Sequence, residues 1–399
     1  MLKRIFIIIV AFCLILSASG CSSMLIKNYT VETDYKDETP AASENSDIVE
    51  IAINGYEELM DEIGRMISKH EEQAKFKFSS YDAKHADIES DVIRAREEAR
   101  TATALAAYAV DFISLEPRRI VAYYEADITI AYRRTKAQAD NILPVVGSYQ
   151  MQDCLEKAVA EASDELVFKM NTAVTKETID AAVSKIFYDN PLDVMTIPEM
   201  EVIQYVGTTG AQTIYEVLFD YGISALELLD YKELAKEAFS ELMESLPEFG
   251  DEVSTAEKAL AAFNRLVEEI EYDPDAVIRS ERYGEDNGLG NSIYGSLVEK
   301  LADSRGIALA FKEMCDTLDI ECMVVTGRYE KINHFWNIIK IDNSYYHVDA
   351  SLAGTLGVEN CFMRSDEEMW GGYTWVVEDY PECNGMMGYY NIVPTPEAG

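Results

Sequence analysis

Three residues in the last third of the chain have the types and the order of a catalytic triad. Ser304 offers a nucleophilic hydroxyl, His334 an imidazole that can take its proton, and Asp349 a carboxylate that can orient the imidazole. Such a set performs acyl transfer, in which the nucleophile attacks a carbonyl carbon and the base returns the proton to the leaving group. These residue types predict peptidase-type or acyl-transfer chemistry, provided that the fold brings them together.

The surrounding sequence predicts how the three side chains meet. Asp342–Asn343 is a two-residue hairpin signal, and counting outward from that turn places Trp336 opposite Asp349. Side chains alternate along a strand, so His334 shares a face with Trp336 and becomes a diagonal neighbour of Asp349. Ser304 stands at the start of a predicted helix whose N-terminus packs against this face.

Three segments resemble motifs of the bacterial transglutaminase-like family, which is related to papain. They are the helix start Ser304–Ala308, the strand His334–Asn337 and the strand Tyr345–Asp349, in the family's order and approximate spacing. The resemblance covers about 256–390. It implies an α+β fold class, with a papain-like C-terminal domain at 251–399 in which a helix packs on an antiparallel sheet. Members of the family act as transglutaminases, peptidases or amidases.

The sequence departs from the family pattern where the chemistry would occur. Ser304 replaces the nucleophilic cysteine, Ile307 the aromatic residue after it, Asp303 the apolar residue before it, and Lys300 a glycine four residues earlier. A cysteine beside a histidine is a thiolate at neutral pH, whereas a serine hydroxyl must lose its proton during the attack. Because the departures cluster at one point, they indicate a domain that kept its fold and lost turnover.

The leading prediction is a non-catalytic module that binds a peptide, a cell-wall component or a partner protein. The resemblance assigns Tyr294, Trp336 and Asn337 to its groove. The first alternative is an active peptidase or acyl-transfer enzyme that uses the serine triad. The second alternative is a structural protein whose N-terminal helices capture the partner. No cofactor is predicted for any of the three.

Each candidate residue also has a purely structural interpretation. Ser304 can cap a helix, His334 can be a satisfied core histidine, and Asp349 can close a turn. His347 is in phase with Asp349, but the family motif gives it no catalytic role. The acidic run 366–368 is predicted to be solvated surface.

The first residues resemble the signal of a bacterial lipoprotein. A basic start precedes the apolar segment 5–16, which is too short to span a bilayer as a stable helix. Small residues then lead to Cys21, the candidate lipidation site, and Ala18 stands where leucine is usual. This pattern predicts a signal peptide at 1–20, export, and lipid anchoring to the outer face of the cytoplasmic membrane. Ordinary secretion is the alternative.

The region between the signal and the C-terminal domain carries little chemical character. Residues 21–48 are polar and acidic and predict a flexible tether, followed by an N-terminal region at 49–250. This region contains no phosphate-binding loop or histidine cluster. Its pattern is helical to about residue 113 and α+β beyond it, with strands at 119–133, 201–206 and 213–221 and helices at 175–187 and 224–246.

Composition argues against one class of partner. The chain has 34 Lys and Arg residues against 72 Asp and Glu residues, a net charge of −38, which repels the phosphates of nucleic acid. The seven cysteines are too sparse for a disulfide scaffold, although Cys361 and Cys383 could pair. No spacing of ligands predicts a metal site.

Overall fold

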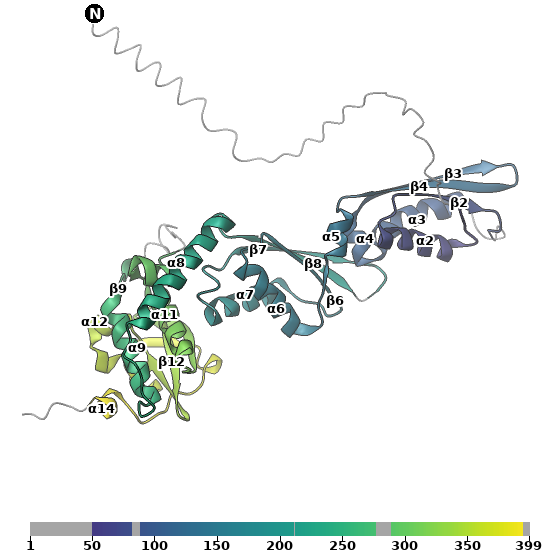
Figure 1. Ribbon diagram of the computed structural model, residues 1–399. Helices are drawn as coiled ribbons and strands as arrows, with labels where there is room; N and C mark the ends of the chain where they lie inside the picture. Colours follow the sequence, from purple (N-terminus) through teal and green to yellow (C-terminus); the bar gives the residue numbers. More distant parts are fainter. Residues whose placement is uncertain (1–49, 82–87, 211, 277–288, 394–399) are drawn as a thin grey trace, which may run out of the picture. The chain divides into compact units, whose positions relative to one another are not determined.

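The computed structural model describes residues 50–81, 88–210, 212–276 and 289–393 (Figure 1). Within these ranges, helices alternate with strands that form three main sheets, which confirms the predicted α+β class. In the same ranges, no helix combines the length and the apolar character needed to cross a membrane. The predicted signal peptide, Cys21 and the tether lie outside the described residues.

The first sheet is built by the chain up to residue 132. Its elements are β1 (Glu50–Ala52), α2 (Tyr56–Lys69), β2 (Gln73–Phe78), α3 (Ile88–Ala102), α4 (Ala104–Ala109), β3 (Val110–Ile120) and β4 (Tyr123–Tyr132). The strand order is β1-β2-β4-β3, with β1 and β2 parallel and the other pairs antiparallel. The strand predicted at 119–133 is β4. The helical prediction up to about residue 113 was wrong for β1, for β2 and for the first residues of β3. In β2 the alternation of buried and part-exposed residues extends over only six positions.

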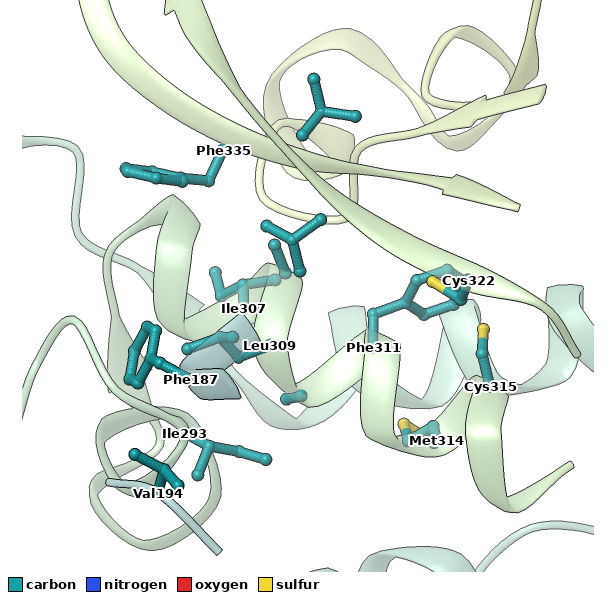
Figure 2. Close-up of a cluster of buried hydrophobic side chains, with 14 of the residues drawn as sticks. Phe187, Val194, Ile293, Ile307, Leu309, Phe311, Met314, Cys315, Cys322 and Phe335 are labelled. Atoms are coloured by element: carbon teal, nitrogen blue, oxygen red, sulfur yellow. The ribbon is translucent and has the colours of Figure 1, made fainter. Parts of the chain in front are cut away.

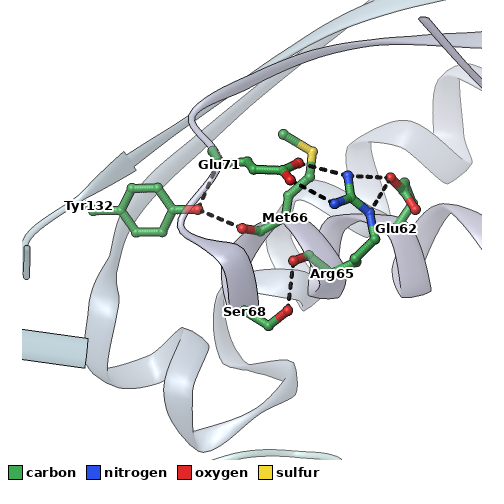
Figure 3. A network of polar contacts seen from close by, with 6 residues as sticks. All are labelled: Glu62, Arg65, Met66, Ser68, Glu71 and Tyr132. Atoms are coloured by element: carbon green, nitrogen blue, oxygen red, sulfur yellow. Dashed lines mark hydrogen bonds and ion pairs between the residues drawn. The ribbon is translucent and has the colours of Figure 1, made fainter. Parts of the chain in front are cut away.

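A polar network fastens the turn between α2 and β2 (Figure 3). The backbone turns at His70, which has a left-handed φ of 58°. The hydroxyl of Tyr132 on β4 donates to the carbonyl of Glu71 at 2.9 Å. The guanidinium of Arg65 donates to the Glu71 carboxylate at 2.8 and 2.7 Å, and to Glu62 at 2.7 Å. The end of α2 is therefore tied to a strand that lies far away in the sequence.

The second sheet has the order β5-β6-β8-β7. Its elements are α5 (Lys136–Asp140), β5 (Leu143–Pro144), α6 (Gly147–Ala160), β6 (Glu165–Met170), α7 (Lys176–Asp189), β7 (Glu199–Val206) and β8 (Thr213–Asp220), and α8 (Ala225–Glu244) follows. Strands β7 and β8 confirm the two strands predicted here. Helices α7 and α8 confirm the two predicted helices.

The second sheet repeats the topology of the first. Both have the same strand order and the same parallel and antiparallel pairs, and the chain runs β-α-β-α-β-β in the second sheet. The first sheet differs only by the additional short helix α4 before its third strand. The turn after the first helix is also the same. Ala162 has a left-handed φ of 51°, as His70 does, and Tyr221 donates to the carbonyl of Ser163 at 3.3 Å, as Tyr132 does to its own turn. This region therefore contains two copies of one module, which the sequence did not reveal.

The C-terminal part contains a five-stranded sheet of order β14-β13-β12-β11-β15. Its elements are α9 (Thr255–Glu269), β9 (Glu271–Tyr272), η1 (Gly295–Glu299), β10 (Leu301–Ala302), α11 (Ser304–Thr317), β11 (Cys322–Tyr329), β12 (Ile332–Ile341), β13 (Ser344–Val348), α12 (Ala353–Leu356), η2 (Val358–Asn360), β14 (Phe362–Arg364), α13 (Asp366–Met369), β15 (Tyr373–Trp375), η3 (Val377–Asp379) and α14 (Tyr389–Ile392). Helix α11 packs on β11 and β12. The pairing of Ile341 with Ser344 and of Asn337 with Val348 confirms the predicted hairpin register.

Helix α11 lies at the centre of the core of this part (Figure 2). Ile307, Leu309 and Phe311 are buried in one apolar cluster. Ile307 therefore fills core volume at the position where the family pattern has an aromatic residue. Cys315 and Cys322 lie in the same cluster as free thiols. Cys315 is fully buried, and burial raises the pKa of its thiol well above the ordinary value, so the structure gives it no place as a substitute nucleophile.

Candidate functional site

Ser304 is the first residue of α11, and its neighbour Asp303 caps the helix. Oδ1 of Asp303 accepts hydrogen bonds from the backbone N–H groups of Arg305 and Gly306 at 2.8 and 3.0 Å. A carboxylate at this position satisfies free N–H groups and complements the positive end of the helix dipole. The interpretation of Ser304 as the cap is therefore wrong, because Asp303 already performs that role.

The glycine of the family pattern that Lys300 replaces has a structural explanation. Lys300 adopts φ 58°, in the left-handed region that glycine enters without strain. Its carbonyl nevertheless accepts the N–H of Glu271 at 2.9 Å, which joins β9 to β10. The substitution has therefore kept the backbone path that leads into α11.

The Ser304 hydroxyl is held against strand β12. Its Oγ accepts the backbone N–H of Phe335, the residue after His334, at 3.2 Å. Ser304 is 1% exposed. Among the described residues, no hydrogen bond joins Ser304 to His334. The structure thus places residue 304 beside the strand of the base without aligning the two side chains for proton transfer.

His334 and Asp349 are brought together as a buried pair. Nε2 of His334 lies 2.7 Å from Oδ2 of Asp349, and the two residues are 3% and 2% exposed. With Nε2 directed at the carboxylate, Nδ1 is the nitrogen left for a nucleophile or a substrate. This is the base-and-orienter arrangement of a triad.

Asp349 is the most heavily bonded side chain of the site. Its Oδ1 accepts the N–H of Ser351 at 3.0 Å and the hydroxyl of the same residue at 2.6 Å, and its Oδ2 accepts the hydroxyl of Tyr373 at 2.8 Å. Burial alone would raise the pKa of Asp349, but the charge of His334 and these hydrogen bonds outweigh it and hold the pKa below its ordinary value. The bond to Ser351 also closes a turn, so Asp349 fulfils its structural interpretation as well.

The residues assigned to the groove lie elsewhere. Trp336 is fully buried, and its ring stacks on that of His334 with a centroid distance of 6.1 Å. Asn337 is 1% exposed and donates to the carbonyl of Ala308 at 2.9 Å, which joins β12 to α11. Tyr294 packs against Tyr231 with ring centroids 4.8 Å apart. Trp336 and Asn337 are therefore core residues, and Tyr294 contacts helix α8.

A cavity of about 470 Å³ opens beside His334. It is lined by Tyr272, Pro274, Tyr329, Glu330, Ile332, His334, Ser351, Leu352, Gly354 and Thr355. Most of this surface is aromatic or apolar, which suits the side chain of a peptide. Of these residues, only His334 was expected at a site from the sequence. Leu352 could have been suspected, because it lies three residues after Asp349. Nothing in the sequence pointed to Tyr329.

One comparison concerns the sequence that surrounds this geometry. Residues 247–350 match the sequence model of the transglutaminase-like superfamily. The chain carries a transglutaminase-like domain. The matched range contains Ser304, His334 and Asp349. The comparison with curated proteins found no match.

Three solved structures are similar to the chain at low identity. One is described as a TGase, with 11% identity over 60% of this chain and 64% of that one, and a TM-score of 0.28. A candidate cysteine protease from Cytophaga hutchinsonii has 14% identity over 42% and 65% of the two chains, and a TM-score of 0.22. A candidate protease from Parabacteroides distasonis has 9% identity over 62% and 37%, and a TM-score of 0.21. The chain spans less than two thirds of each of these proteins.

A second hydrogen-bonded chain crosses the C-terminal part of the protein. The indole Nε1 of Trp336 donates to Nδ1 of His347 at 2.9 Å, and Nε2 of His347 lies 2.8 Å from Oδ1 of Asp366. Oδ2 of Asp366 accepts the N–H of Cys383 at 3.0 Å. The prediction that the acidic run is solvated surface was therefore wrong for Asp366, because a histidine 19 positions earlier in the sequence holds it.

His347, Asp366 and Cys383 also meet closely enough to suggest a metal site. One ligand atom of each lies within 4.8 Å of the others. The hydrogen bond from Trp336 opposes coordination, however. An indole N–H can only donate, so Nδ1 of His347 carries no proton and Nε2 carries the one that bonds Asp366. If a metal bound Nε2, the proton of the imidazole would move to Nδ1. The N–H of Trp336 and the N–H at Nδ1 of His347 would then be two donors facing each other.

The disulfide that the sequence left open is not formed. Cys361 and Cys383 are both free and buried. Burial, together with the nearby charge of Asp349, raises the pKa of the Cys361 thiol to about 12. Both residues therefore behave as buried thiols.

Proposed function

We propose that the transglutaminase-like domain binds peptide without turning it over. The observation that carries this proposal is the state of Ser304, whose Oγ accepts the N–H of Phe335 and which forms no hydrogen bond with His334 among the described residues. A serine that attacks a carbonyl must pass its proton to the base during the attack, which requires a hydrogen bond to that base. The pair of His334 and Asp349 retains its geometry, so the binding site persists beside an idle base.

The ligand class follows from the cavity beside His334. Its aromatic and apolar lining fits a hydrophobic side chain, and Glu330 offers one carboxylate at the edge. The hydroxyl of Tyr272 is neutral at neutral pH and can donate to a peptide carbonyl, and burial raises its pKa further. A peptide, a cell-wall stem peptide or an extended segment of a partner protein supplies these groups.

Restoring the nucleophile tests the proposal. Ser304→Cys should gain amidase activity on fluorogenic peptide amides, or incorporate a fluorescent alkylamine into a glutamine peptide. A thiolate needs no proton transfer at the moment of attack. The wild-type protein and the double variant Ser304→Cys/His334→Ala serve as inactive controls. Turnover by the wild-type protein equal to that of Ser304→Cys would contradict the proposal.

A second candidate function is a serine hydrolase, favoured by the 2.7 Å contact between His334 and Asp349. It requires a rotation of the Ser304 side chain away from Phe335 when substrate binds. Hydrolysis of the same peptide amides by the wild-type protein, lost in both Ser304→Ala and His334→Ala, would establish it. Activity that survives Ser304→Ala would eliminate it.

The proposed place of action is the outer face of the bacterial cytoplasmic membrane. The apolar segment 5–16 followed by Cys21 supports cleavage of a signal peptide and acylation of the cysteine. Two or more acyl chains give a stable anchor. Metabolic labelling with an alkyne fatty acid should mark the wild-type protein and leave Cys21→Ala unlabelled. Equal labelling of both proteins would contradict the anchor.

A further inference from the structure

The transglutaminase-like domain has a second cavity, of about 690 Å³, which shares no lining residue with the cavity beside His334. We call it the acidic groove. It is lined by Ser365, Asp366, Glu367, Trp370, Val377, Tyr380, Glu382, Cys383, Asn384, Gly385 and Met386. All three charged residues in this lining are acidic. Neither the sequence motifs nor the proposed function gives it a role.

The carboxylates of the acidic groove have no cationic partner within the described part of the chain. Asp366 pairs with His347, and no Lys or Arg lies within ion-pair distance of Glu367 or Glu382 there. Many other acidic groups in the protein are paired, for example Asp193 with Lys232 at 3.1 Å. The groove therefore keeps a local excess of negative charge.

His347 does not cancel the charge of Asp366. The indole of Trp336 donates to Nδ1 of His347, which leaves this histidine neutral with its only proton on Nε2. Burial acts in the same direction and lowers the pKa of His347. Asp366 therefore lines the groove with a carboxylate that is hydrogen-bonded to a neutral imidazole and has no cationic partner among the described residues.

Large apolar side chains stand exposed around these carboxylates. Trp370 is 65% exposed, Met386 is 98% exposed and Val377 is 47% exposed. An indole face beside carboxylates is suited to a guanidinium or an ammonium group, through cation–π attraction and ion pairing together. The methionine and the valine offer adaptable apolar contacts to a neighbouring side chain.

From these observations we infer that the acidic groove binds an arginine or lysine side chain of a partner peptide, with an adjacent apolar residue packed on Trp370 and Met386. Charge complementarity identifies the occupant, because the lining supplies three carboxylates and no cation. The inference is independent of catalysis and of the cavity beside His334. It gives the domain a second contact with a protein ligand and a preference for basic sequence.

Calorimetric titration of the full chain with a capped Leu-Arg-Leu peptide tests the inference. Citrulline in place of arginine gives a neutral peptide of the same shape, and lysine in its place separates guanidinium from ammonium. The arginine peptide should bind at least about fivefold more tightly than the citrulline peptide, which corresponds to one exposed ion pair of about 1 kcal/mol. Its affinity should also fall as salt is raised.

Variants locate the binding in the groove. Glu367→Gln/Glu382→Gln should weaken the arginine peptide about tenfold and remove most of the salt dependence. Trp370→Ala should weaken the arginine and citrulline peptides alike. Glu378→Gln and Tyr390→Ala change an exposed acid and an exposed aromatic that do not line the groove, so they should leave affinity unchanged.

Four results would overturn the inference. The first is equal affinity for the arginine and citrulline peptides, and the second is the absence of any binding. The third is unchanged affinity in the double glutamine variant. If Leu352→Ala in the cavity beside His334 abolished binding and the groove variants did not, the peptide would occupy the other cavity and the acidic groove would have no such role.

Discussion

The two halves of the candidate site differ in how much of the triad arrangement they keep. On the strand side, His334 and Asp349 are buried, 2.7 Å apart, and held by Ser351 and Tyr373. On the helix side, Ser304 bonds a backbone N–H instead of the base. The departures from the family pattern also fall on the helix side.

This difference shows which part of the site the fold needs. The carboxylate of Asp349 accepts hydrogen bonds from a histidine, a serine and a tyrosine and closes a turn. Its loss would leave several buried groups without a hydrogen-bond partner. Residue 304 holds a single backbone hydrogen bond. Loss of the nucleophile therefore has little effect on the stability of the fold. The base and the residue that orients it are kept because buried groups depend on them for hydrogen bonds.

The largest expected effect lies on the strand side. Asp349→Ala should lower the free energy of unfolding by about 3–5 kcal/mol, because it leaves His334, Ser351 and Tyr373 without their acceptor. Chemical denaturation monitored by circular dichroism measures it, with the exposed Asp379→Ala as the matched control. A loss below about 1 kcal/mol would show that the network contributes little.

The second effect concerns the support beneath the base. Trp336→Phe keeps an aromatic ring but removes the N–H that bonds His347, and should cost about 2 kcal/mol. Trp375→Phe provides the matched control, because Trp375 has no side-chain hydrogen bond among the described residues. Equal losses in the two variants would assign the effect to packing alone.

Matched serine substitutions compare the two halves directly. Ser351→Ala removes a donor to the charged Asp349 and should cost about 2 kcal/mol, whereas Ser304→Ala removes an acceptor for one N–H and should cost about 1 kcal/mol. Measuring the free energy of unfolding of each variant tests this difference. A larger loss for Ser304→Ala would reverse the comparison.

The pH dependence of stability reports the strand side alone. The folded pKa of Asp349 lies below its unfolded value, so its contribution is fully present above about pH 4 and is lost as pH falls through the folded pKa. Asp349→Asn should therefore flatten the stability curve in acid. If both proteins lost stability in parallel below pH 4, the carboxylate would not be held by its partners.

The smallest effect is expected when the glycine of the family pattern is restored on the helix side. Lys300→Gly should raise the free energy of unfolding by up to about 1 kcal/mol, since glycine adopts the left-handed backbone without strain. Asp319→Gly has a similar φ of 58° at the other end of α11 and serves as a matched test of the backbone effect. A destabilised Lys300→Gly would mean that the 3.6 Å pair with Glu269 outweighs the strain.

The strand side could be predicted further than the rest. A two-residue turn fixes the register of the hairpin, and the register brings His334 within reach of Asp349. The contact of His347 with Asp366 could not be predicted, because it depends on how a later turn folds back over the sheet. The cap at Asp303 was readable, since aspartate caps helices as well as serine does.

The most direct test of the central claim is labelling of the wild-type protein with a fluorophosphonate probe, located by peptide mass spectrometry. An operative Ser304 would attack the phosphorus and form a stable adduct, with His334 taking its proton. We predict no adduct at Ser304, because its hydroxyl contacts the N–H of Phe335 and forms no hydrogen bond with His334 among the described residues. Stoichiometric labelling at Ser304 that disappears in His334→Ala would contradict the account.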